Sequence, residues 1–173
     1  MKVRFDEIPA DGLRLEIKDE AWFPDHDLSR SGGVVASVFL RRDNDRVLME
    51  GSLATSVLLQ CDRCLEFFES SLVDDFEVDF ELADESMIES VADEHLIPTT
   101  EMDTVFLSEP AIDIYEVLSQ QVFLALPEKL LCSDGCLGLC NRCGANLNMD
   151  SCQCEAAVAA SPFSVLAGLK KKK

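Results

Sequence analysis

The chain has 173 residues, of which 47% are hydrophobic, and its net charge at pH 7 is −18. The length and apolar content predict one globular domain, with a small appendage, and argue against disorder throughout. Such a charge repels phosphate backbones and attracts basic partners, so broad nucleic-acid binding is disfavoured.

The acidic residues are concentrated in the middle of the chain. Residues 61–120 hold 18 acids and a single base, Arg63, whereas the segments on either side are close to balanced. The beginning of the chain lacks an apolar signal segment, and no run approaches the roughly 18 apolar residues of a membrane span. We therefore expect a cytoplasmic protein that does not enter a membrane.

The first 60 residues predict antiparallel strands. Leu13, Leu15 and Ile17 alternate with charged residues, which is typical of a short strand with one buried face. Residues 34–40 and 47–59 predict two longer strands joined by a polar turn, with a bulge at Gly51 as one option. Residues 19–33 contain several turn-forming residues and are expected to form a loop.

The clearest alternation in the chain follows, within residues 75–82. Its apolar positions predict a strand with one face on the core, and its acidic positions predict a row of carboxylates on the other face. Those carboxylates are either a solvated face or a surface that binds a basic partner. The apolar positions are Phe76, Val78, Phe80 and Leu82, and the acidic ones are Asp75, Glu77, Asp79 and Glu81.

One main helix is predicted over residues 109–126, after an acidic loop at residues 83–109. Ser108 is a suitable N-cap, Pro110 suits a first turn, and Pro127 ends the apolar periodicity. The simplest interpretation of its apolar stripe is a helix that covers the sheet. A groove for a partner is the alternative.

The cysteines form two widely separated groups. Six of the eight lie between Cys132 and Cys154, and the other two, Cys61 and Cys64, fall at the turn of the predicted hairpin. A Cys-x-x-Cys-Gly turn brings two sulfur atoms onto one tetrahedral ion. Reducing conditions in the cytosol favour metal ligation over disulfides. Structural zinc, in one or two ions, is the preferred interpretation; redox thiols, disulfides and an iron–sulfur cluster are the alternatives.

Loop length decides which cysteines we expect to share an ion. Closing the shorter loops favours one local site and a second site that ties the hairpin turn to the segment after the helix. The alternative pairs the two Cys-x-x-Cys turns with each other. The expected first site is Cys140, Cys143, Cys152 and Cys154, and the possible second site is Cys61, Cys64, Cys132 and Cys136.

The end of the chain predicts a short helix after a tether at residues 155–160. Pro162 suits its first turn, and Phe163 and Leu166 are candidate partner contacts on one face. The lysines at 170–173 suit its C-terminal end and could make weak contact with RNA phosphates.

Together these elements predict an α+β protein: a mostly antiparallel sheet or partly open barrel covered by one main helix, with a small cysteine-rich zinc-binding segment. The expected organisation is a β domain over residues 1–131, the cysteine-rich segment over 132–154 packed on it, and a tether, short helix and basic tail over 155–173.

The landmarks resemble those of the YceD family, also called large ribosomal RNA subunit accumulation proteins. The Gly-Leu-Cys-x-x-Cys-Gly-x-Asn-Leu-Asn string is the specific part of the resemblance. Some relatives lack the C-terminal cluster, so the resemblance alone does not imply metal. The matching pieces are Cys61-Asp-Arg-Cys64-Leu65, Leu124-Ala-Leu126-Pro127, Cys132, Cys136 through Asn148, Cys152-Gln-Cys154 and Pro162-Phe163-Ser-Val-Leu166.

The resemblance implies a non-enzymatic role in the accumulation of large-subunit ribosomal RNA and in ribosome assembly. The acidic middle of the chain adds an expected partner, a basic ribosomal protein or an assembly intermediate. The alternative is a thiol redox or metal-dependent enzyme that uses Cys61 and Cys64. That alternative is weaker because extended structure, not a helix N-terminus, is expected after the pair.

Overall fold

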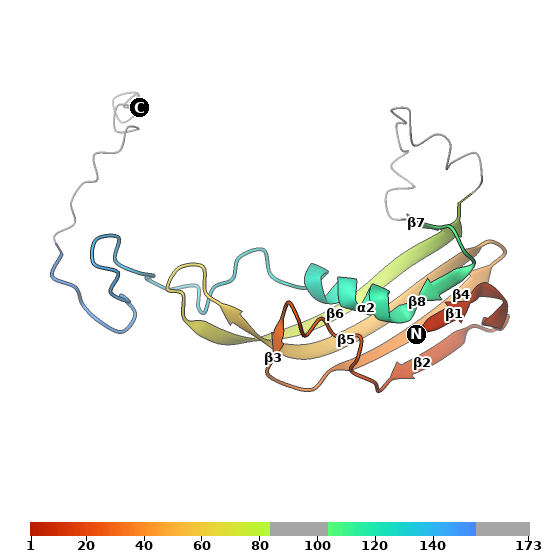
Figure 1. The fold of residues 1–173 in the computed structure, drawn as a ribbon, viewed down its shortest axis with the longest axis horizontal. Helices are drawn as coiled ribbons and strands as arrows, with labels where there is room; N and C mark the ends of the chain where they lie inside the picture. Colours follow the sequence, from red (N-terminus) through yellow and green to blue (C-terminus); the bar gives the residue numbers. More distant parts are fainter. Residues whose placement is uncertain (84–103, 155–173) are drawn as a thin grey trace, which may run out of the picture.

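The computed structural model describes residues 1–83 and 104–154. Two sheets and one α-helix make up this part of the chain (Figure 1). The elements are β1 (Lys2–Arg4), the 3-10 turn η1 (Phe5–Glu7), β2 (Leu13–Ile17), β3 (Ser29–Arg30), β4 (Val35–Asp43), β5 (Arg46–Gln60), β6 (Phe67–Leu82), β7 (Thr104–Leu107), β8 (Ala111–Asp113) and α2 (Ile114–Leu124).

The main sheet is open rather than closed into a barrel. Its strand order is β2-β4-β5-β6-β7, with β3 paired to β5 beyond the end of β4. Every pair is antiparallel except β6 and β7, which run parallel between Asp79 and Leu82. The expectation of a mostly antiparallel sheet is confirmed. A second, two-stranded sheet joins β1 to β8.

The β5–β6 hairpin is the longest strand pair of the sheet, and it positions the first cysteine pair. Arg46 pairs with Glu81 at one end and Gln60 with Phe67 at the other, without a break in register. The bulge considered at Gly51 is therefore absent: Gly51 pairs in register with both Val38 and Phe76. A Cβ at Gly51 would overlap the Phe76 ring, so the glycine makes room for that ring.

The core lies on one face of this sheet. Leu40, Met49 and Phe80 are among its fully buried side chains, and α2 contributes Ile114 and Leu118. An 11-residue helix extends about 16 Å, whereas a 15-residue strand extends about 50 Å. The predicted covering by one main helix is consequently only partial. Loop and turn residues cover the rest of the core: Phe5, Ile8, Trp22 and Phe23.

The helix begins later than the sequence indicated. Ala111–Asp113 form β8 against β1, so the predicted start at 109, with Ser108 as its cap, is wrong. The helix starts at Ile114, and the Asp113 carboxylate accepts a hydrogen bond from the Tyr115 amide as the N-cap. Pairing with a distant strand is a tertiary effect that local periodicity does not report.

Two predicted loops contain strands. Thr104–Leu107, within the loop expected at 83–109, adds to the sheet as β7, and Ser29–Arg30, within the loop expected at 19–33, pairs with β5. The rest of the acidic loop, residues 84–103, lies outside the described residues. The same holds for the predicted tether and short helix, with Phe163 and Leu166, and for the lysines at 170–173. No helix within residues 1–83 and 104–154 has the length and apolar character needed to cross a membrane.

Candidate metal centres

The eight cysteines gather into two groups of four. The sulfur atoms of Cys61, Cys64, Cys132 and Cys136 lie within 4.8 Å of one another, and so do those of Cys140, Cys143, Cys152 and Cys154. The structure thus brings together the sets that the shorter loops favoured, and it does not bring the two Cys-x-x-Cys turns to one point.

Both Cys-x-x-Cys turns have the same backbone hydrogen bonds. In the first turn the Cys61 amide donates to the Glu66 carbonyl, and the Leu65 amide donates to the Cys61 carbonyl. In the second turn Cys140 bonds in the same way to Ala145, and Gly144 to Cys140. The residue after the second cysteine has a positive φ in each turn, 61° at Leu65 and 73° at Gly144. This shared geometry points both sulfurs of a turn to one side.

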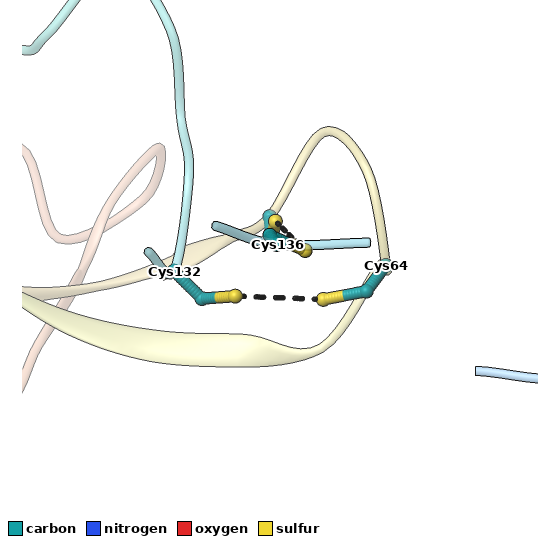
Figure 2. A group of neighbouring side chains, drawn as sticks. Cys64, Cys132 and Cys136 are labelled. Carbon is teal, nitrogen blue, oxygen red and sulfur yellow. Dashed lines mark hydrogen bonds between the residues drawn. The ribbon is translucent and has the colours of Figure 1, made fainter. Parts of the chain in front are cut away.

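The distances within the first group fit a tetrahedral ion. The Cys61 and Cys136 sulfurs are 3.8 Å apart, and those of Cys64 and Cys132 are 3.7 Å apart (Figure 2). A Zn–S bond of roughly 2.3 Å places the sulfurs of a tetrahedron about 3.8 Å apart. A disulfide would bring two sulfurs to about 2.05 Å. The donor set therefore fits a divalent thiophilic metal such as zinc.

In the first group the pKa of one thiol is lowered and that of another is raised. Burial raises the pKa of Cys61, but the backbone N–H groups of Cys132, Cys64 and Arg63 outweigh it and lower the pKa to about 6. The neighbouring Cys136 sulfur raises the pKa of Cys132 to about 12. One thiol therefore ionises readily, and the next resists a second negative charge nearby. A divalent cation would remove that repulsion.

In the second group, too, the pKa of one thiol is lowered and that of another is raised. The backbone N–H groups of Cys143 and Arg142 lower the pKa of Cys140 to about 6. The Cys143 sulfur, with burial, raises the pKa of Cys154 to about 12. The second group is more accessible than the first, because Cys140 is its one buried cysteine, whereas three cysteines of the first group are buried.

Polar contacts attach the segment that carries Cys132 and Cys136 to the hairpin turn. The Asp62 amide donates to the Leu130 carbonyl, and the Asp62 carboxylate accepts from the Leu130 amide, at 2.7 and 2.9 Å. The Arg63 guanidinium donates to the Cys136 carbonyl at 3.0 Å. Asp62 and Arg63, the two residues between the first cysteines, therefore position the other two sulfurs.

A second set of contacts joins the two groups to each other. The Asn148 side-chain amide, from the loop of the second group, donates to the Cys136 sulfur at 3.3 Å, and its oxygen accepts from the Leu137 amide at 2.8 Å. The Leu139 amide donates to the Arg63 carbonyl at 3.1 Å, and a Cβ at Gly138 would lie 3.0 Å from that carbonyl oxygen. Spacing predicted the two groups of cysteines that the structure brings together, but it missed Asn148, because Asn-Leu-Asn alone does not indicate a sulfur contact.

The predicted carboxylates project from the other face of the sheet. Asp75 and Glu77 are exposed, and Asp79 and Glu81 are half-buried. Glu81 pairs with Arg46 at 2.6 Å. Within residues 1–83 and 104–154, Asp75, Glu77 and Asp79 have no salt bridge. No described lysine or arginine therefore neutralises these three carboxylates.

Gly144 tests whether the turn geometry matters for metal binding. A side chain at φ 73° costs about 1 kcal/mol, so we expect Gly144→Ala to lower the metal affinity of the second group about five-fold. Competition with a chromophoric chelator measures this. Gly135→Ala is the matched control, because a Cβ there meets nothing within 4 Å and its φ is ordinary. Equal affinities for the two variants would contradict the prediction.

The fold and these centres define an α+β protein with an open sheet and two four-cysteine clusters suited to structural metal. The model of the YceD family, described as large ribosomal RNA subunit accumulation protein YceD, matches residues 49–170. The chain belongs to this family. A search of curated proteins found no match, and neither did a search of solved structures.

Proposed function

We propose that this protein is a non-enzymatic factor that supports large-subunit ribosome assembly by binding a basic ribosomal protein or assembly intermediate. The family description connects the chain with the accumulation of large-subunit ribosomal RNA. The partner's chemistry comes from the outer face of β6, where Asp75, Glu77 and Asp79 have no salt bridge to any described residue. That unpaired row of carboxylates is the observation that carries the proposal.

A protein partner fits this surface better than RNA does. A phosphate backbone would be repelled by the carboxylates, whereas a basic protein segment would be attracted and would bind faster at low salt. The lysines at 170–173 offer RNA a contact that is weaker and sensitive to salt. Phe163 and Leu166 remain predicted partner contacts, outside the described residues. The role places the protein in the cytoplasm, with the subunit precursors.

The metal centres act in this proposal as rigid supports. Cys61 and Cys64 each face a cysteine of the 132–136 segment, so zinc bound there would have four sulfur ligands and no open position. Catalytic zinc keeps a position for water or substrate. Zinc would instead fix the hairpin end of the sheet, and with it the orientation of the acidic strand.

Neutralising the acidic row tests the proposal. We expect Asp75→Asn, Glu77→Gln and Asp79→Asn in one chain to abolish co-sedimentation with large-subunit precursors and to lower the yield of large-subunit ribosomal RNA. The reason is the loss of charge attraction at an unchanged fold. Sucrose gradients and mass spectrometry of the co-purified proteins measure both effects.

The matched control removes the same charge elsewhere. Asp11, Asp27 and Glu128 are exposed acids outside the main sheet, and their amide variants should co-sediment like the natural chain. Normal co-sedimentation of the β6 variant would overturn the proposal. Equal losses in both triple variants would show that only total charge matters.

A further inference from the structure

We propose that the free edge of β6, residues 67–78, binds an extended basic segment of another protein by strand addition. The inference rests on the proposed function and deepens it, because it identifies where on the acidic surface the basic partner binds and in which conformation. Three features of β6 support it: its unpaired backbone, its charge and its half-covered apolar side chains.

Within residues 1–83 and 104–154, the backbone of β6 is unpaired along most of one side. β7 pairs with β6 only at residues 79–82, and no other described segment pairs with residues 67–78 on that side. At an extension of about 3.3 Å per residue, this edge is roughly 40 Å long. Unpaired strand edges are templates for another extended chain.

Two hydrogen bonds show which backbone groups point outward. The Cys61 amide donates to the Glu66 carbonyl, and the Leu82 amide donates to the Asp45 carbonyl. In an antiparallel pair these bonds alternate, so the even-numbered residues of β6 bond to β5 and the odd-numbered ones face the open side. The outward N–H and C=O groups belong to Phe67, Glu69, Ser71, Val73, Asp75 and Glu77.

The edge is acidic, and one of its charges faces inward. Residues 67–78 contain Glu69, Asp74, Asp75 and Glu77 and no basic residue. Asp74 pairs across from the buried Leu53, so its carboxylate is on the core face of an edge strand, a feature that discourages indiscriminate pairing. A second copy of this chain would bring the same carboxylates and another net charge of −18. The charge thus favours a basic segment over self-association.

The side chains along the edge define the pattern of the bound segment. Asp75 and Glu77 project from the outer face, so lysine or arginine at alternate positions would lie beside them. On the core face Phe76 and Val78 are only partly buried, whereas Met49 of the neighbouring strand is fully buried. An added strand with β-branched residues at the intervening positions would cover them. The preferred partner therefore alternates basic and β-branched residues.

A proline at Val73 tests strand addition without changing charge. Val73 is 73% exposed, and its amide faces the open edge, so Val73→Pro removes one outward donor and no bond to β5. The probe is an acetylated peptide that alternates lysine with valine or threonine. We expect Val73→Pro to weaken its binding to the full chain about ten-fold, through the lost hydrogen bond and the bulk of the ring. Val73→Thr, which keeps the amide, should bind like the natural chain.

Amide hydrogen exchange on the natural chain adds a direct readout. We expect the amides of Glu69, Ser71, Val73, Asp75 and Glu77 to exchange quickly in the free chain and to gain protection when the lysine peptide binds. A peptide with glutamate in place of lysine should give none. Protection already present in the free chain, from its own residues or from a second copy at high concentration, would overturn the inference.

The outcomes separate this inference from the proposed function. If the peptide binds Val73→Pro as tightly as the natural chain but fails to bind Asp75→Asn/Glu77→Gln, strand addition is wrong and the acidic surface remains the partner site. If the peptide fails to bind the natural chain, strand addition is again wrong. Retained co-sedimentation of the neutralised β6 variant with subunit precursors would instead overturn the proposed function.

Discussion

Removal of metal from the intact chain is expected to release residues 130–154 from the β5–β6 hairpin while the sheet stays folded. The apolar contacts that hold this segment are few among the described residues: Phe68 and Leu131 pack against the cluster of Cys61, Cys64 and Cys136, and Leu130 packs against the main core. The sheet has its own large core, independent of the sulfur atoms. Binding to a structural zinc site contributes on the order of 10 kcal/mol, so the segment should lose its order without it.

Hydrogen exchange and elemental analysis measure this result together. We expect the freshly isolated, reduced chain to hold two zinc ions, one for each group of four sulfurs. After chelation, the amides of residues 130–154 should lose protection, and those of β5 should keep theirs. Persistent protection of residues 130–154 in metal-free protein would contradict the prediction, and so would collapse of the whole sheet.

Replacing one cysteine at a time should show which centre holds which part of the 130–154 segment. Cys140→Ser should lower the zinc content from two ions to one and expose residues 139–154 to limited proteolysis, with the sheet still protected. Cys61→Ser should detach the longer segment from residue 130 onward, because Cys61 lies on the hairpin itself. Ser151→Ala, at an exposed residue next to Cys152, is the control and should change neither property.

Much of this arrangement could be predicted from local sequence patterns. Alternation of apolar and charged residues predicted the strands because burial of one face has a period of two, and β6 confirms this between Phe76 and Leu82. The family was recognisable from the second cysteine turn and the asparagines after it, and the match over residues 49–170 confirms it. Cysteine spacing also indicated two groups of four, because short loops are easier to close.

The structural features that local sequence patterns did not predict depend on contacts between distant residues. The start of α2 is set by pairing of β8 with β1, more than 100 residues away, and β7 is a strand because β6 offers an edge. The positive φ of Leu65 was also missed, because Leu65 is not a glycine. Leu65 directly follows its Cys-x-x-Cys pair, as Gly144 follows the other pair. Comparing the two turns residue by residue would have indicated this conformation.

A hydrogen bond between the two centres is expected to have a large effect on zinc affinity. Asn148 lies in the loop that carries the second group, yet its side-chain amide donates to the sulfur of Cys136 in the first group. Hydrogen bonds to a ligand from outside the metal's own coordination sphere are worth about 10- to 100-fold in metal affinity. We therefore expect Asn148→Asp to weaken zinc binding at the first group by this factor, although Asn148 is not a ligand.

The aspartate variant removes both donations of the Asn148 side-chain amide, to the Cys136 sulfur and to the Asn146 side-chain oxygen. A carboxylate can still accept the hydrogen bond from the Leu137 amide, but it cannot donate to Cys136, and it brings a negative charge beside a thiolate. Asn148→Ala, which loses all three side-chain hydrogen bonds but adds no charge, should weaken zinc binding less. Asn141→Ala is the control, since Asn141 is exposed and has no side-chain hydrogen bond to any described residue.

Competition titrations with a chelator, followed by hydrogen exchange at residues 130–137, assign the loss to one centre. If the centres are coupled as the structure indicates, Cys140→Ser should also weaken the first group, because loss of the second metal loosens the loop that holds Asn148. Cys61→Ser should weaken the second group as well, through the bond from the Leu139 amide to the Arg63 carbonyl. Independent affinities in all of these variants would show that each centre folds alone. Mutual dependence would mean that the hairpin end and the cysteine-rich segment bind metal as one cooperative unit.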